Sequence, residues 1–375
     1  MEDRTVVLGA GYAGATCVRS LGGEVDEIVW VSEDDFHFVT HEAHRLVRDP
    51  SLEEELVIPV DEIASRGCDF VEATVESVDF DDRVVETTAG DLLYDHLVVA
   101  FGQRTADYGI PGVREYGLTL KSPEDAHAVR YAAEGVPDGG RVVVGGGGLS
   151  GVQVAGEIAE RFEARGGRPP SVVVVEALDR VMPDADDDVR AAIERKMRKK
   201  GIVAHTGDPV TEATDEEVLL GSGESVPYDA FVWTGGLAPH DVETSPPPEK
   251  GERGALAVDE KLRATGHEKV FAAGDAAHVV DKKGNEAPPT AWAARQQGDV
   301  VATNVVRAVE GEPLRRYEMN DPGTLISVGD ARVGKVAGQV VEGPPARVLK
   351  RGAAVRHIAQ TAGVKRGLSS SLADL

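Results

Sequence analysis

Residues 5–14 read TVVLGAGYAG, and this short stretch decides the fold. An apolar, β-branched run ends in three glycines, Gly9, Gly11 and Gly14, and a helix-compatible stretch follows before the next apolar run at residues 27–31. The first glycine permits a tight turn, the second lets the backbone approach a pyrophosphate, and the third lets helix and strand pack closely. The order strand, glycine turn, helix, strand therefore predicts a dinucleotide-binding unit.

A second copy of this pattern lies at residues 141–156, RVVVGGGGLSGVQVAG. Its in-frame glycines are Gly146, Gly148 and Gly151, and the strand-like run that follows ends at Glu176. An acidic residue at this position is placed to accept hydrogen bonds from both ribose hydroxyls, which favours NADH over NADPH. Two such units predict two dinucleotide sites in one chain.

Each unit also has a second half. Residues 95–102 and 229–235 are matching apolar runs that end in a small residue and a glycine. Residues 270–277, VFAAGDAA, end a strand in Gly-Asp and place a carboxylate and helix N-terminal amides near a ligand's ribityl and phosphate groups. The cofactor contacts expected from these runs are Ala100, Gly102, Gly235, Gly274 and Asp275.

Length and composition exclude several classes of protein. A chain of 375 residues with 41% hydrophobic residues suits two domains, with a third small piece, and global disorder is not expected. The sequence shows no membrane-spanning apolar stretch and no secretory leader, and two cysteines cannot form a disulfide framework. A net charge of -25 argues against nucleic-acid binding. It also favours a salt-loaded cytoplasm, and thus a halophilic archaeal source, over a merely acidic soluble protein.

On these motifs the chain resembles the two-dinucleotide flavoprotein reductases, and within them the type II NADH dehydrogenases. The resemblance covers residues 4–340, and its most specific part is TADYGIPGVREYGLTLKSPEDAHAVR (105–130), which resembles that family's bridge between its FAD and NADH domains. The other motifs follow in the family's order: GGGGLSGVQVAGEI (145–158), VEALDRVMP (175–183), VFAAGDAAH (270–278) and PPTAWAARQQG (288–298).

The resemblance implies an α/β fold with two Rossmann-like domains. The FAD-binding domain would be discontinuous, at residues 1–113 and 264–322, with the NADH-binding domain inserted at 114–263 and a C-terminal segment at 323–375. It also implies a peripheral enzyme on the inner face of the cell membrane. Such an enzyme oxidises NADH through FAD and reduces a quinone of the menaquinone type, without pumping ions.

The resemblance also assigns site residues. Gly274 and Asp275 match the family's FAD-contacting pair, Thr40 falls at an FAD-contacting position, and Glu176 matches the ribose-binding acid. The helix at residues 288–298 matches the quinone site, where small residues let the quinone ring reach the flavin. The quinone-site residues would be Ala291, Trp292, Ala294 and Gln296, and weak catalytic roles fall to Gln153 and Gln296.

Three positions depart from the family pattern. The second FAD strand ends in Ser32 where an acid is usual, so the adjacent Glu33 is expected to reach the adenosine ribose. Gln153 stands where many relatives carry Glu, which keeps a hydrogen-bonding amide but removes the charge. Trp292 replaces a usual Gln, and its ring could either stack on the acceptor or block the entrance.

The C-terminal segment is basic on an acidic chain. Residues 326–375 hold eight basic and three acidic residues. From residue 346 a short helix is expected, whose apolar stripe would be Val348, Gly352, Val355, Ile358/Ala359 and Ala362, with Lys350 mostly off it. It could lie on an anionic lipid surface, dock on the protein's own acidic surface, or contribute to a homodimer.

Other signals are weaker. His37, His41 and His44 have helical spacing but no completed metal pattern, so no metal site is expected. Cys17 and Cys68 lie outside the motifs that sulfide:quinone oxidoreductases need. Two other functions remain open: a soluble NADH-dependent reductase of a small iron–sulfur protein, and a non-enzymatic flavoprotein that senses the redox state.

Overall fold

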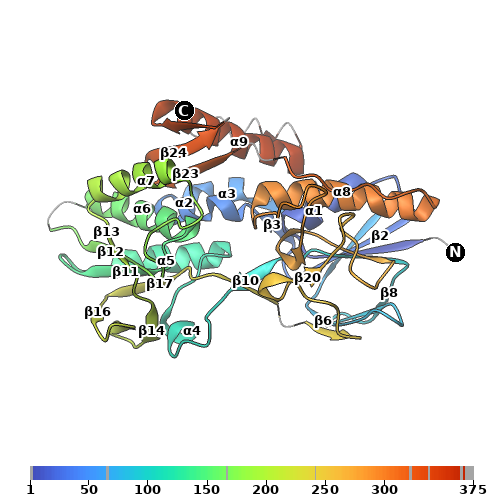
Figure 1. The fold of residues 1–375 in the computed structure, drawn as a ribbon, viewed down its shortest axis with the longest axis horizontal. Coiled ribbons are helices and arrows are strands. Elements are labelled where there is room, and N and C mark those ends of the chain that lie inside the picture. The colour runs from blue at the N-terminus through green and yellow to red at the C-terminus, as the bar shows by residue number, and fades with distance from the viewer. Residues whose placement is uncertain are drawn as a thin grey trace.

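The computed structural model describes residues 3–64, 67–165, 168–240, 242–320, 323–336, 338–363 and 366–367. Figure 1 shows an elongated molecule with two α/β lobes side by side and the C-terminal strands and helix lying across both. The predicted fold class, two Rossmann-like units with a short C-terminal segment, is confirmed.

The first lobe is built on a parallel sheet in the order β21-β9-β1-β2-β5. Val6, Val7 and Leu8 of the central strand are fully buried, as expected for a strand covered on both faces. The helices α1 (Tyr12–Leu21) and α8 (Ala291–Glu310) pack against each other in this lobe (Figure 1). The strands are β1 (Arg4–Leu8), β2 (Glu27–Ser32), β5 (Cys68–Glu72), β9 (His96–Val99) and β21 (Val270–Ala272).

The second lobe repeats this plan with the parallel order β13-β12-β11-β17. Its central strand again carries fully buried valines, Val142, Val143 and Val144. The strands are β11 (Arg141–Gly145), β12 (Ser171–Glu176), β13 (Val203–Thr206) and β17 (Ala230–Trp233), and the helices are α5 (Pro123–Gly135), α6 (Leu149–Glu163) and α7 (Asp187–Lys199).

Small strands return the chain from the second lobe to the first. After β17, the strand β18 (Leu237–Pro239) pairs with β10 (Gln103–Thr105), and β19 (Glu243–Ser245) pairs with β6 (Val75–Asp79). Further on, β20 (Leu256–Ala257) pairs with β22 (Ala277–His278). The strands β18, β19 and β20 are therefore hydrogen-bonded to the first lobe.

The remaining short elements complete the two lobes. The strands are β3 (Phe36–Phe38), β4 (Val57–Pro59), β7 (Val84–Thr87), β8 (Leu92–Leu93), β14 (Val210–Ala213), β15 (Glu217–Leu220) and β16 (Ser225–Pro227). The helices and 3-10 turns are η1 (Thr40–Glu42), α2 (Ala43–Arg48), η2 (Pro50–Leu52), α3 (Glu53–Leu56), η3 (Val60–Glu62), α4 (Val113–Tyr116), η4 (Glu252–Gly254) and η5 (Gly274–Ala276).

The C-terminal segment forms an antiparallel sheet, β23 (Thr324–Val328), β24 (Ala331–Val336) and β25 (Gln339–Glu342), followed by α9 (Pro344–Ala362). The predicted helix is confirmed, but most of its predicted apolar stripe is not the buried one. Val348 is 71% exposed whereas Lys350 is buried, because α9 docks through Ala346, Lys350, Ala354, His357, Ile358 and Thr361.

Candidate functional site

The first glycine turn follows β1 at the carboxyl edge of the first sheet. Gly9 has φ +101°, and a Cβ there would lie 2.6 Å from the carbonyl oxygen of Ala100 at the end of β9. A Cβ at Gly14 would collide with the carbonyl oxygen of Gly9. Gly11 is the N-cap of α1, so the helix begins at the turn and its free amides face the edge.

Other predicted FAD contacts lie near this edge. Glu33 is exposed directly after β2, and Gly102, with φ +70°, follows β9. Thr40 begins η1, where its hydroxyl donates to the Phe38 carbonyl oxygen over 3.2 Å. Gly274 and Asp275 follow β21, the strand paired with β9. The parallel strands thus bring these residues, which are far apart in sequence, to one edge.

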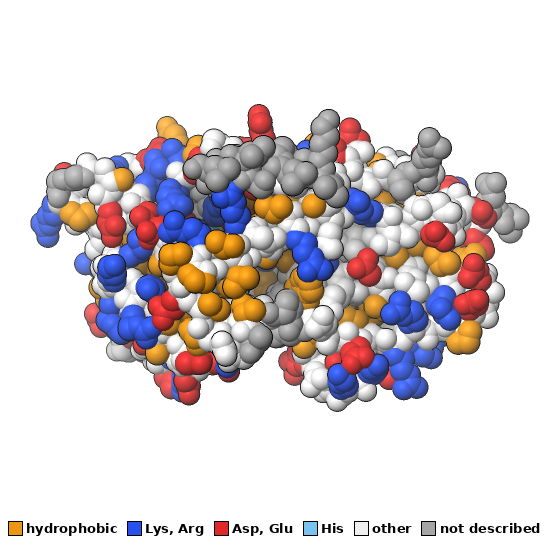
Figure 2. Space-filling model, turned by 90° about the horizontal axis from the view of Figure 1, so that it is seen from above, with side chains coloured by type: hydrophobic (Ala, Val, Ile, Leu, Met, Phe, Trp, Pro, Cys, Tyr) orange, Lys and Arg blue, Asp and Glu red, His pale blue; other side chains and the backbone are white. Residues whose placement is uncertain are grey.

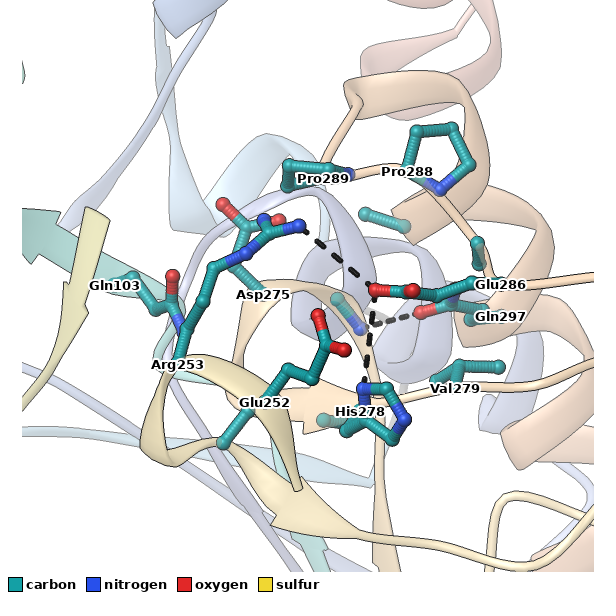
Figure 3. A pocket seen from close by; sticks show the side chains of 15 residues that line it. Gln103, Glu252, Arg253, Asp275, His278, Val279, Glu286, Pro288, Pro289 and Gln297 are labelled. Atoms are coloured by element: carbon teal, nitrogen blue, oxygen red, sulfur yellow. Dashed lines mark hydrogen bonds and ion pairs between the residues drawn. The ribbon is translucent and has the colours of Figure 1, made fainter. Parts of the chain in front are cut away.

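A pocket opens beside Gly274 and Asp275 (Figure 3). Gln297 of α8 points into it, and its Oε1 accepts a hydrogen bond of 2.7 Å from the backbone amide of Gly274. Gln103 of β10 lines the same pocket, and its buried Oε1 has no hydrogen-bond partner among the residues that the structure describes. A buried polar atom without a partner is costly, so Gln103 is poised for a ligand donor.

Charged side chains surround the pocket. Glu286 lies 3.8 Å from Arg253 and 3.9 Å from His278, the two contacts drawn in Figure 3. Burial raises the pKa of the Asp275 carboxyl, while Lys121 and Arg253 act in the opposite direction. Asp275 is therefore a desolvated acceptor that gains from a hydroxyl donor brought by a ligand.

These residues fit FAD. The Gly9–Gly14 turn leaves room for a pyrophosphate at the N-terminus of α1, and Asp275 and Gln103 provide buried acceptors for a polyol and a ring N–H. Two observations support this fit. The turn at Gly9 and Gly14 has no room for a Cβ atom, and the buried oxygen of Gln103 has no partner among the described residues.

The second glycine turn has the same geometry. Gly146 has φ +100°, a Cβ at Gly151 would collide with its carbonyl oxygen, and Gly148 is the N-cap of α6. Glu176 ends β12, where its Oε2 accepts 2.6 Å from the Gly147 amide. Its other oxygen accepts 2.9 Å from the amide of residue 178, so the carboxylate is held beside the turn. Gly235 closes the edge after β17.

Gln153 of α6 is buried and points toward the C-terminal segment. Its Oε1 accepts 2.8 Å from Lys350 Nζ and 3.2 Å from the Ser327 amide. Lys350 also donates to the Ser327 hydroxyl over 2.5 Å and lies 3.5 Å from Glu42 Oε1. The side chain of Gln153 therefore joins the second lobe to β23 and α9.

The predicted quinone residues lie in the first turns of α8. Ala294 lines the pocket of Figure 3, whereas Trp292 and Gln296 face the backbone of Asn320. The Trp292 indole donates to the Asn320 carbonyl over 2.6 Å, and the Gln296 amide does so over 2.9 Å. Ala291 begins the helix.

The face of the Trp292 ring is approached by two guanidinium groups. Arg295 lies 5.8 Å and Arg356 5.3 Å from the ring centroid. The indole N–H is also bound to the Asn320 backbone. The Trp292 ring is therefore held in place by two guanidinium groups and the Asn320 carbonyl, and whether it stacks on an acceptor or blocks the entrance stays a prediction.

The histidines have structural partners. His37 Nδ1 donates 2.7 Å to the Ala10 carbonyl, which fixes its Nε2 as the acceptor of a 3.1 Å bond from His357. His41 Nδ1 lies 2.7 Å from the Tyr12 hydroxyl. Within the described ranges no group of three or more potential ligands, His44 included, could hold a metal ion.

Three residues that sequence reasoning missed matter here: Gln103, Gln297 and Lys350. Gln297 lies one position after the predicted Gln296, and the helical spacing from Ala294 could have indicated it. Gln103 follows the predicted Gly102, but its unpaired oxygen is visible only in three dimensions. No local signal marks Lys350.

Comparisons with known proteins agree with this geometry. The family model described as pyridine nucleotide-disulphide oxidoreductase matches residues 3–298. A type II NADH:quinone oxidoreductase of Staphylococcus saprophyticus is 26% identical over 97% of each chain. A protein of Synechocystis named demethylphylloquinone reductase NdbB is 28% identical over 93% of this chain and 91% of its own.

Solved structures share the fold. NDH2 from Plasmodium falciparum, in complex with NADH, superposes with a TM-score of 0.88 at 16% identity, over 99% of this chain and 98% of its own. The sulfide:quinone oxidoreductase of Aquifex aeolicus gives 0.82 at 16% identity, over 96% and 92%.

Proposed function

The chain belongs to the pyridine nucleotide-disulphide oxidoreductase family, and from this membership we propose that it transfers a hydride from NADH to FAD and then two electrons to a quinone, without pumping ions. The observation that carries the proposal is the pair of glycine turns, each at the carboxyl edge of its own parallel sheet. Full-length similarity to type II NADH:quinone oxidoreductases supports the choice of donor and acceptor.

The first lobe holds FAD in this proposal. Its contacts are Gly9, Gly11, Gly14, Glu33, Thr40, Ala100, Gly102, Gly274 and Asp275. The second lobe holds NADH through Gly146, Gly148, Gly151, Glu176 and Gly235. The FAD-binding unit comprises residues 1–113 and 264–322 and the NADH-binding unit begins at 114. It runs to residue 263, and its last part pairs through β18, β19 and β20 with strands of the first lobe.

Bound FAD supplies the redox chemistry by accepting a hydride and releasing two electrons. The chain's own residues position the donor and exclude water. The N-terminus of α6 faces the NADH pyrophosphate, and the Glu176 carboxylate receives the ribose hydroxyls and repels a 2′-phosphate. The Gln297 amide holds Gly274 beside the pocket.

The electron acceptor in this proposal is a quinone of the menaquinone type. It approaches along the first turns of α8, where Ala291 and Ala294 leave room and Trp292 and Gln296 fix the wall through Asn320. Gln153 keeps a weak catalytic role in this proposal, and its side chain also binds Lys350 of α9.

Membrane association is peripheral and on the inner face in this proposal. No helix of the described part of the chain is long and apolar enough to cross a membrane. The outward face of α9 exposes Val348 and Leu349, at 71% and 42%, with Arg347 and Arg356 nearby. Such a face suits an anionic lipid surface. A homodimer through the same segment is the alternative use.

Steady-state kinetics test the proposal. Purified holoprotein is supplied with NADH and with a soluble naphthoquinone, a short-chain ubiquinone analogue or a small iron–sulfur protein as acceptor. We expect fast NADH oxidation with a quinone and slow oxidation with the iron–sulfur protein. Turnover with the iron–sulfur protein alone would replace the proposal by a soluble reductase, and slow turnover with every acceptor would replace it by a redox sensor.

A further inference from the structure

A second cavity, of about 240 Å³, lies between α2, β24 and α9. Its wall is unusually cationic for a chain whose net charge is -25. Among the described residues, six cationic side chains line it against three carboxylates, Glu42, Glu55 and Asp330. The six are Arg45, Arg48, Arg332, Arg347, Lys350 and Arg351.

Two carboxylates of the wall are paired with cations, and one of its cations is paired with a carboxylate outside it. Glu42 lies 3.5 Å from both Arg45 and Lys350, and Asp330 lies 3.0 Å from Lys200, which is outside the cavity wall. Arg48 lies 3.0 Å from Glu157, which is also outside the wall. Even with Glu157 counted, the six cations of the wall outnumber the four carboxylates.

Two of the six cations of the wall are largely removed from water. The Lys350 side chain is 10% and that of Arg45 12% exposed. Charges at such positions interact with an anion more strongly than surface charges do, and dissolved salt screens them less.

Apolar side chains of α9 lie in and next to this cavity. Ala354 and Val355 line the cavity itself, and Val348, one position after the wall residue Arg347, is exposed. Figure 2 views this face and shows hydrophobic side chains left of its middle, next to Lys and Arg. A phospholipid presents the same pairing, a phosphate next to hydrocarbon.

We propose that this cavity binds the phosphate of an anionic membrane lipid, with the acyl chains lying against the exposed apolar side chains of α9. The inference rests on the proposed membrane association and adds a defined headgroup site to it. The membrane contact then consists of one seated phosphate rather than of diffuse attraction between a basic helix and an anionic surface.

Vesicle co-sedimentation of the holoprotein tests this site, with phosphatidylglycerol and phosphatidylcholine vesicles. The assay is run at about 1 M KCl, where the Debye length is ~3 Å and diffuse attraction is screened. We expect the wild type to bind phosphatidylglycerol selectively and Arg45→Gln to bind at least about tenfold more weakly. The control is Arg356→Gln, which also removes one positive charge but at a position of α9 outside the cavity wall. It should change the affinity for phosphatidylglycerol vesicles less than about twofold.

Free glycerol phosphate is a second probe that needs no variant. Millimolar glycerol phosphate should displace the wild type from phosphatidylglycerol vesicles. Loss of vesicle binding at high salt, or equal effects of Arg45→Gln and Arg356→Gln, would overturn the headgroup site. Tight binding of inorganic phosphate, measured by calorimetry, without selective binding to vesicles would show that the cavity binds free phosphate. That result would contradict the proposal that its ligand is a lipid.

NADH oxidation with a soluble quinone, measured without vesicles, separates the two proposals. An active enzyme that ignores phosphatidylglycerol contradicts the headgroup site alone. An inactive protein that still binds phosphatidylglycerol contradicts the proposed reaction and leaves the site standing.

Discussion

Lys350 of α9 donates a 2.8 Å hydrogen bond to Gln153 of α6, so the C-terminal helix is tied to the nucleotide helix of the second lobe. Lys350 also lies 3.5 Å from the Glu42 carboxylate, as does Arg45. Although burial opposes ionisation, Lys350 lowers the pKa of the Glu42 carboxyl. The Lys350 amine therefore contacts Glu42 of the first lobe and Gln153 of the second.

Lys350→Met should therefore destabilise the protein strongly. It leaves Glu42 short of a partner and Gln153 with one hydrogen bond fewer, a class of change that costs about 3–5 kcal/mol. Urea unfolding measures the effect, with Val348→Ala on the exposed side of the same helix as the control, expected within about 0.5 kcal/mol of wild type. Equal stabilities of the two variants would show that the buried amine contributes nothing.

The two glycine turns should separate by ligand. A Cβ at Gly14 would collide with Gly9, and a Cβ at Gly151 would collide with Gly146. Gly14→Ala is expected to lose FAD during purification, measured as flavin absorbance per protein. Gly151→Ala is expected to keep FAD but to raise the KM for NADH at least about tenfold. Loss of flavin from both variants would argue against two separate dinucleotide sites.

Glu176 should set the preference between NADH and NADPH. Its carboxylate is held by the backbone amide of Gly147 at the glycine turn, where a 2′-phosphate would meet a negative charge. Glu176→Gln keeps the shape and removes the charge. The ratio of kcat/KM for NADH over NADPH is expected to fall about tenfold, equivalent to about 1.4 kcal/mol. An unchanged ratio would place the ribose elsewhere.

Glu157 should make stability depend on pH. Burial raises its pKa from 4.5 to about 7, although Arg48, 3.0 Å away, opposes the shift. The folded state therefore holds a proton that the unfolded state has lost between these two values. Below pH 4.5 the Glu157 carboxyl is protonated in both states and does not lower the free energy of unfolding. That free energy falls as the pH rises from there through about 7.

The neutral variant Glu157→Gln isolates this effect. The stability of wild type relative to the variant should decrease by about 3 kcal/mol between acid and alkaline pH. Urea unfolding at a series of pH values measures it. A difference that is flat with pH, or that grows in favour of the wild type, would show that Glu157 is ionised throughout.

Local pattern was enough to predict the two lobes. The turns at Gly9 and Gly146 impose a backbone that few other residues adopt, and their valine runs are buried on both faces as a parallel sheet requires. The sequence also placed Gly274 and Asp275 at a strand end, where the structure has them.

Side-chain partners brought from afar were not predictable. The role expected for Gln153 near the flavin stays a prediction, but its hydrogen bond to Lys350, from a helix nearly two hundred residues away, could not be foreseen. The helical pattern placed Lys350 mostly off the apolar stripe of its helix. The sequence does not show that the buried carboxylate of Glu42 lies beside it. The buried face of α9 is likewise determined by the elements that it contacts, β23, β24, β25 and α1. Val348 is therefore exposed and Ala354 is buried.

Rapid-mixing absorbance of the holoprotein tests the central claim most directly. The flavin is first bleached with NADH in the absence of oxygen, and a short-chain menaquinone or ubiquinone analogue is then added. We expect fast bleaching followed by fast recovery of the flavin absorbance that depends on the quinone. Fast bleaching without recovery would contradict the claim, because NADH would then reduce a flavin that no quinone can reach.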